Sequence, residues 1–190
     1  AHPEVRCYRY WPELSSDCRL MNKLLRDLTD YSMSDQLTKQ RSDLCNLLRR
    51  AYLSCLPLTE GTNKTLTYTS RVSCAYMPLD SPKMMEALLN LIVNALDAVS
   101  DNGSVQIILT KSNEQFVVSI IDDGCGIAPK QLLTIFHPFT TTKPDGTGLG
   151  LPVAKRIIEG HGGHIRVSSA PNQGATFTFL LPCSFSSDKK

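Results

Sequence analysis

Residues 140–151 of the chain read TTTKPDGTGLGL, a loop of threonines and glycines that runs without a gap into an apolar helix. Three of its glycines, Gly146, Gly148 and Gly150, fall within five residues. Glycine lets backbone N–H groups approach an anion closely, and the N-terminus of a helix adds partial positive charge there. A phosphate-binding loop is one interpretation, but a tight turn before a helix uses the same residues. The neighbouring segments must decide between the two.

The composition bounds the class of protein. The chain has 190 residues, of which 42% are hydrophobic and 20% charged, with a formal net charge of +2. These values favour one folded domain with an appendage, and they exclude a disordered chain or a strongly basic nucleic-acid-binding surface. Seven cysteines lie scattered without C-x-x-C spacing, which argues against a zinc site or a disulfide framework and suits a reducing cytoplasm. No apolar run reaches about 18 residues and the chain begins at Ala1, so we expect a cytoplasmic fragment whose parent could be membrane-tethered.

Apolar spacing and helix breakers divide the chain into a helical part and a mixed part. Apolar residues seven apart over 13–33 form a short heptad seam, typical of a helix that pairs with another helix, although packing on its own domain gives the same pattern. A second amphipathic helix is predicted over about 40–56. Strands at 66–72, 104–110, 116–121, 165–169 and 176–181 then alternate with helices at about 81–100 and 150–159. Because hairpins join neighbouring strands, the prediction is an α/β two-layer sandwich with a mixed, mostly antiparallel sheet, preceded by a helical segment.

The predicted helix over 81–100 carries a polar stripe. It is apolar nearly all round, yet Glu86, Asn90, Asn94 and Asp97 interrupt it at spacings that place them on one face. If buried, each unpaired group would cost roughly 1–3 kcal/mol, so protein groups or a polar ligand must satisfy it; a solvent-facing stripe needs no partner. Side-chain amides are neutral oxygen ligands that Mg²⁺ accepts when phosphates complete its shell.

A second polar feature ends the predicted strand at 116–121. There Asp122 is followed by Asp123, Gly124, Cys125 and Gly126. A carboxylate at this point can accept a hydrogen bond from an exocyclic amine, and the glycines let the chain pass close to a flat ring. The same residues also suit an ordinary turn after a strand.

Taken in order, these motifs resemble the ATP-binding domain shared by sensor histidine kinases, DNA gyrase, the mismatch-repair ATPases and the large ATP-dependent chaperone. The resemblance covers about residues 62–183. Its motifs are an N box at Asn90-x-x-x-Asn94-Ala95, a first glycine box at Asp122-x-Gly124-x-Gly126, an F box at Phe136-His137-Pro138-Phe139, a second glycine box at Gly146-Thr147-Gly148-Leu149-Gly150-Leu151 and a last glycine motif at Gly174-Ala175-Thr176-Phe177. By this resemblance, the opening glycines would close an ATP lid and present backbone amides to the phosphates.

The resemblance implies ATP and Mg²⁺ as cofactors, with Asp122 on the adenine amine, Asn94 on Mg²⁺ and Asn90 beside the phosphates. Lys143, in the lid, is placed to contact the terminal phosphates, although a solvated loop lysine is the alternative. The family often has lysine where this chain has Asp97, a carboxylate that would repel phosphate if it pointed inward, so the predicted site excludes it. No catalytic residue is assigned. The other implied nucleotide-binding positions are Gly124, Gly126, Ile127, Phe139, Gly146, Thr147, Gly148, Leu149, Gly150 and Thr176.

The residue one helical turn before Asn94 separates two activities. Hydrolases of this superfamily carry glutamate there as the general base, whereas this chain has Asn90, whose amide cannot take a proton. Glu86 lies a further turn away, at about 6 Å per four residues. We therefore favour the catalytic part of a sensor histidine kinase, which transfers the ATP γ-phosphoryl group to a histidine for relay to a response regulator. The alternatives are an ATP-driven hydrolase, a serine-phosphorylating kinase of the anti-sigma type, and a degenerate dimerising scaffold.

The expected division is an N-terminal remnant over 1–12, a helical segment over 13–60, the ATP-binding kinase domain over 62–183 and a tail over 184–190. The helical segment resembles the second dimerisation helix of such kinases and its connection, which implies a homodimer. No nucleic-acid partner is expected. None of the histidines is well placed to be the phosphoacceptor.

Overall fold

The computed structural model describes residues 37–143 and 146–183, together with six single positions between residues 10 and 21. Most of the predicted segments 1–12 and 13–33, and all of the predicted tail 184–190, therefore lie outside the described residues. Among the helices of the described part, none is long and apolar enough to cross a membrane.

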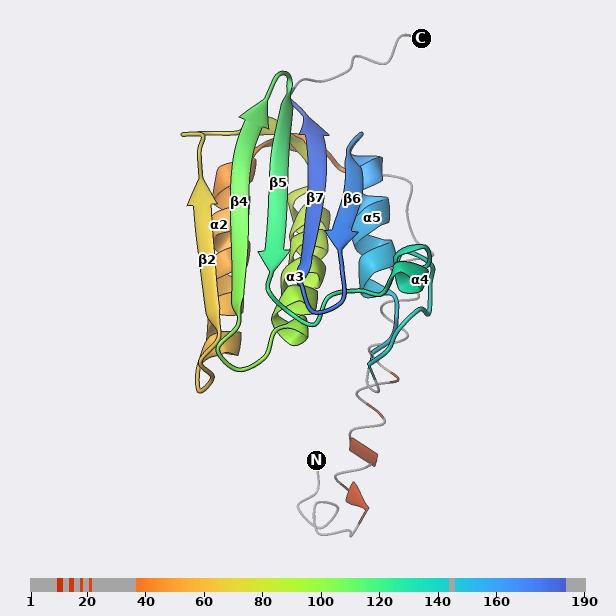
Figure 1. Ribbon diagram of the computed structural model, residues 1–190. Coiled ribbons are helices and arrows are strands. Elements are labelled where there is room, and N and C mark those ends of the chain that lie inside the picture. The colour runs from red at the N-terminus through yellow and green to blue at the C-terminus, as the bar shows by residue number, and fades with distance from the viewer. Residues whose placement is uncertain are drawn as a thin grey trace.

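Five strands form one mixed sheet, which Figure 1 shows from its open face. Their order across the sheet is β2 (Thr65–Ser70), β4 (Ser104–Ser112), β5 (Gln115–Asp122), β7 (Ala175–Pro182) and β6 (His164–Ser169). The pair β2–β4 is parallel, and the other three pairs are antiparallel. The predicted mixed, mostly antiparallel sheet is confirmed.

Three helices lie together behind this sheet (Figure 1). They are α2 (Leu44–Cys55), α3 (Ser81–Ala98) and α5 (Gly150–Gly160); two shorter elements are the 3-10 helix η2 (Leu56–Thr59) and α4 (Pro129–Leu132). α3 begins at Asp80, whose carboxylate accepts a hydrogen bond from the Lys83 amide at 3.1 Å, and proline follows in its first turn. The two-layer α/β sandwich predicted from the sequence is confirmed.

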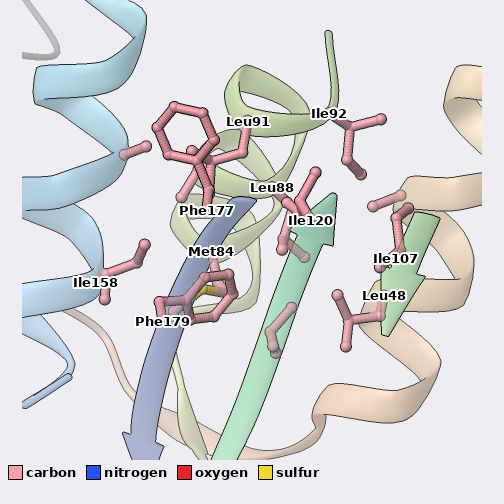
Figure 2. Packing of buried hydrophobic residues seen from close by; sticks show 14 of the residues in the cluster. Leu48, Met84, Leu88, Leu91, Ile92, Ile107, Ile120, Ile158, Phe177 and Phe179 are labelled. Carbon is pink, nitrogen blue, oxygen red and sulfur yellow. The ribbon is translucent and has the colours of Figure 1, made fainter. Parts of the chain in front are cut away.

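The core fills the space between the sheet and the three helices. Buried and half-buried positions alternate along β5 and β7, as expected for strands with one face against helices. Figure 2 shows Phe177 and Phe179 of β7 beside Met84 of α3 and Ile158 of α5. Residues of α2 belong to the same core cluster: Leu44, Leu47, Leu48, Ala51 and Cys55. The segment predicted as a connection thus contributes one wall of the core.

A strand of a two-stranded ribbon, β1, precedes α2 in a segment where helix was predicted. β1 (Gln40–Asp43) pairs antiparallel with β3 (Tyr76–Leu79), so α2 begins four residues later than the predicted start at about 40. The reason is the cap at Asp43: its Oδ1 accepts from the Cys45 amide at 3.0 Å and from the Ala75 amide at 2.9 Å. A single carboxylate thereby starts the helix and holds the approach to β3.

A buried histidine joins the ribbon, α3 and α5. The Asp80 amide donates to Nε2 of His161 at 2.9 Å, and Nδ1 of His161 lies 2.7 Å from the Ile157 carbonyl oxygen. Because an amide can only donate, Nε2 must be the acceptor and Nδ1 must carry the proton, so the ring is neutral. Burial lowers the pKa of His161 below its ordinary value. Asp80 also accepts from the Thr38 amide at 2.9 Å, which fixes the segment before β1 to the start of α3.

Candidate functional site

The site is built along the C-terminal half of α3. Asn90 and Asn94 are half-buried on this helix, and the carbonyl of Ala98 accepts a hydrogen bond from the Cys125 amide at 3.1 Å. Eight residues of α-helix separate Asn90 from Ala98, a rise of about 12 Å. At Asn90 this helix face lies beside Gly150 at the start of α5, and at Ala98 it meets the loop after β5.

Asp122 is the buried acid of the site. It is 5% exposed, and the amides of Gly124 and Ala175 both donate to its Oδ1, at 3.0 and 3.2 Å. Burial raises the pKa of Asp122, and these two amides oppose that rise by stabilising the carboxylate. Within the described residues, all protein hydrogen bonds to this carboxylate go to Oδ1, so Oδ2 is the oxygen left to accept from a ligand.

Three glycines hold the loop around Asp122 in place. A Cβ on Gly124 would collide with the carbonyl oxygen of Ala98, and a Cβ on Gly174 would collide with the Asp122 carbonyl oxygen. Gly126 has φ +69 and is packed against the Ala170 carbonyl. The Gly174 amide also donates to the Gly124 carbonyl at 3.0 Å, so the first and last glycine motifs are interlocked.

Two other predicted positions lie in this same region. The Ile127 amide donates to the Ser169 hydroxyl at 2.8 Å, which fixes the loop to the end of β6. Thr176 is half-buried on β7, opposite Ile121 of β5. The Ile127 loop thus lies at the end of β5 that carries Asp122, whereas the alternation along β7 puts the Thr176 side chain on the opposite face of the sheet from Asp122, so the structure does not bring this predicted residue to the acid.

The lid leaves the body of the protein through a narrow neck. The Phe139 amide donates to the Gly148 carbonyl at 3.0 Å, and both residues have positive φ, +62 and +66. A side chain on Gly148 would press against the backbone of Phe139 and Thr140, so glycine is required here. The Phe139 ring itself is 63% exposed, which means that its backbone forms the neck while its ring points outward.

The second glycine box connects the lid to the start of α5, which lies beside α3. Leu149 is fully buried and anchors the start of α5. A Cβ on Gly150 would lie 3.5 Å from Oδ1 of Asn90, so the helix start lies directly beside the first asparagine of the N box. Gly146 packs against the Thr141 hydroxyl within the lid, and the Leu149 amide lies 3.4 Å from the Thr147 hydroxyl. The structure thus places the second glycine box beside Asn90, the first asparagine of the N box.

Lys143 reaches from the lid to α3. Its ammonium donates to Oδ1 of Asn94 at 3.1 Å and to Oδ2 of Asp97 at 2.9 Å. The sequence prediction excluded Asp97 because a carboxylate beside phosphate is repulsive; the structure places it at the rim of the site, paired with a lid cation. One feature of the sequence indicated such a pairing: the last turn of α3 contains Asp97 but no basic residue that could offset its charge.

These residues fit a magnesium nucleotide. Asn94 offers an amide oxygen that already accepts from a cation, and Asp122 offers a free acceptor oxygen on a loop that Gly124 and Gly174 hold in place. No group of three His, Cys, Asp or Glu side chains able to hold a metal occurs among the described residues. A metal held here would share its shell with the nucleotide's phosphates.

Comparison with known proteins defines the class. Residues 79–184 match the family model described as histidine kinase-, DNA gyrase B-, and HSP90-like ATPases. The chain belongs to this family, as the motif order predicted.

The chain is similar to named sensor histidine kinases and to solved histidine kinase structures. The chain is 32% identical over 170 residues to the sensor histidine kinase ZraS of Salmonella typhimurium, covering 89% of this chain and 37% of that protein. The solved catalytic domain of histidine kinase ThkA is 29% identical, with a TM-score of 0.70 over 77% of this chain and 96% of that one. Full-length ShkA in complex with AMPPNP is 25% identical, with a TM-score of 0.81 over 91% of this chain and 38% of that one. The chain spans about a third of the length of the curated relatives it matches.

Proposed function

We propose that this chain is the catalytic, ATP-binding part of a sensor histidine kinase, which binds Mg²⁺·ATP and transfers the γ-phosphoryl group to a histidine for relay to a response regulator. The observation that carries the proposal is the amide at position 90. Asn90 occupies the turn before Asn94, beside Gly150, where a hydrolase needs a carboxylate to activate water. The nearest carboxylate along α3 toward its start is Glu86, which is paired with Lys83 at 3.1 Å. ATP is therefore held intact until an acceptor arrives.

The roles of the site residues follow from their placement. Oδ2 of Asp122 accepts from the adenine amine, and the ring lies against the loop that the interlocked glycines hold in place. The second glycine box and the start of α5 face the phosphates; the Gly146 amide, which donates to the Lys143 carbonyl at 3.1 Å, is not counted among the phosphate donors. Asn94 holds Mg²⁺, which when bound neutralises charge on the phosphate oxygens. The chain's own contribution is to position the nucleotide and to exclude water attack.

The division of the chain is part of the proposal. Because α2 lies in the same core as α3 and the sheet, we place the start of the ATP-binding unit near residue 37. Residues 13–33 would pair with the same helix of a second copy, and the acceptor histidine would lie on a helix outside this chain. A homodimer, a response regulator as phosphate acceptor and a cytoplasmic location complete the proposal.

The test follows the fate of the labelled γ-phosphate. We expect the chain with Mg²⁺ to bind γ-labelled ATP and to release almost no free phosphate. Adding the dimerisation hairpin of a full-length relative should move label onto that hairpin in an acid-labile, base-stable form, as expected of phosphohistidine. Asn94→Ala should abolish this transfer, whereas Asn46→Ala, an exposed asparagine on α2, should not. Steady phosphate release without acceptor would instead identify a hydrolase, and acid-stable label would identify a serine kinase.

A further inference from the structure

The contact between the lid and the end of α3 involves one cation and two acceptors. The Lys143 ammonium bonds Asn94 and Asp97 at 3.1 and 2.9 Å, and these acceptors lie three residues apart on one helix face. The ion pair is half-exposed, with 42% of the lysine side chain and 52% of the aspartate side chain accessible. It is the kind of contact that can form and break readily.

The position of Asp97 at the end of α3 favours a contact with a cation. It is the next-to-last residue of α3, where the helix dipole places partial negative charge, so a carboxylate there is unfavourable. No basic residue in that turn offsets it. A positive group arriving from the lid therefore gains from both the carboxylate and the helix end.

The Lys143 ammonium bonds the Asn94 oxygen that a bound Mg²⁺ would need as a ligand. Oδ1 of Asn94 accepts from Lys143 in this structure, and it is also the oxygen proposed for Mg²⁺. Two cations within a few ångströms of one neutral oxygen repel each other strongly. Lys143 and Mg²⁺ therefore cannot both occupy Asn94 in this arrangement.

We propose that Asp97 is a positioning residue that holds Lys143 on Asn94 while the site is without nucleotide, so that entry of Mg²⁺·nucleotide exchanges one cation for another. Lys143, displaced from Asn94, becomes available to the phosphates, and the lid is released from α3. This inference rests on the proposed ATP site, but the contact itself involves only groups of the chain. Asp97 thus acts through Lys143 and does not touch the reacting atoms.

The first experiment needs no nucleotide. Hydrogen exchange of the lid, residues 139–149, is compared between the unaltered chain and Asp97→Asn. Exposed ion pairs contribute about 0.2–1 kcal/mol, so lid exchange should become about 1.5- to 5-fold faster. Glu86→Gln removes an ion pair at the other end of the same helix and should leave lid exchange unchanged. Equal lid exchange in the unaltered chain and Asp97→Asn would overturn the proposal.

The second experiment separates the contact from simple charge repulsion. Binding of AMPPNP with Mg²⁺ should tighten in Asp97→Asn by about the same factor, because the competing contact is lost. In a Lys143→Met background, Asp97→Asn should give a clearly smaller gain, since only repulsion of phosphate remains. An equal gain in both backgrounds would overturn the exchange. If lid exchange responds as expected but no variant binds nucleotide, the proposed function fails while the lid contact stands, so the two failures are distinguishable.

Discussion

Replacing Asp122 by asparagine changes the site at a single atom that faces the ligand. The two amides that hold the carboxylate both donate to Oδ1, at 3.0 and 3.2 Å. An asparagine that keeps its carbonyl oxygen in that position retains both bonds and turns its Nδ2 group toward the place where adenine is proposed to bind. An acceptor is thereby converted to a donor, while the surrounding loop keeps its contacts.

The size of the effect follows from the bond that is lost. A hydrogen bond to a charged group is worth about 1.5–3 kcal/mol, so ATP affinity should fall about 10- to 150-fold. Affinity for GTP should fall much less or rise, because guanine presents a carbonyl oxygen where adenine presents its amine. The ratio of ATP to GTP affinity is therefore the informative quantity.

Competitive binding of the two nucleotides, measured by calorimetry with Mg²⁺, tests this ratio. Asp123→Asn is the matched control, because its carboxylate is exposed and bonds the amide and hydroxyl of Ser104, at 2.8 and 2.7 Å. Urea unfolding of both variants checks that the fold is retained. An Asp122→Asn chain that prefers ATP over GTP as strongly as the unaltered chain would refute the proposed role of this carboxylate.

Three further predictions concern the metal, the loop packing and the buried histidine. Asn94→Asp should weaken Mg²⁺-dependent nucleotide binding, by about tenfold for each 1.4 kcal/mol of repulsion between the new carboxylate and phosphate, and calorimetry at several Mg²⁺ concentrations that shows no change would refute the metal role. Gly174→Ala should destabilise the protein by about 1–3 kcal/mol in urea unfolding, because φ is +70 and the new Cβ meets the Asp122 carbonyl; wild-type stability would be incompatible with this packing. Burial lowers the pKa of His161 from 6.5, so its neutral ring stabilises the native state fully above that pH, and the free energy of unfolding should decrease as pH falls from 6.5 toward the native pKa. His161→Asn should flatten this slope between pH 7 and 5, whereas a parallel slope in both proteins would show that other groups cause it.

The elements that the sequence predicted correctly are those whose signal is local. α3 combines a capped start with an apolar pattern, and β4 and β5 are joined through Asn113, which has the positive φ of a tight turn. The short ribbon was missed because β1 and β3 have four residues each and their pairing joins distant positions, from Asp43 with Tyr76, 33 apart, to Gln40 with Leu79, 39 apart. Such strands are stabilised by tertiary contacts, which local propensity does not record.

In the candidate site, too, residues in local motifs were predicted, and contacts between distant residues were not. Asn90, Asn94 and Asp122 were predicted as site residues because each belongs to a local motif with a chemical reason. The Lys143–Asp97 contact was missed because it joins residues 46 apart through a lid whose path the sequence does not specify. The sequence also could not show that Gly124 and Gly174 interlock, since that depends on β5 and β7 being neighbours in the sheet.

The neck between Phe139 and Gly148 makes the lid a module that can change length. Its two ends are fixed by the 3.0 Å hydrogen bond between these residues, and the chain beyond them is anchored by buried Leu149 and by the packing of Gly150 against Asn90. Residues inserted within the neck would therefore not shift the sheet or α3, and each doubling of loop length costs only about 0.6 kcal/mol of closure entropy. A reporter group can thus be inserted in the lid by an engineer without rebuilding the core, provided that Lys143 keeps its reach to α3.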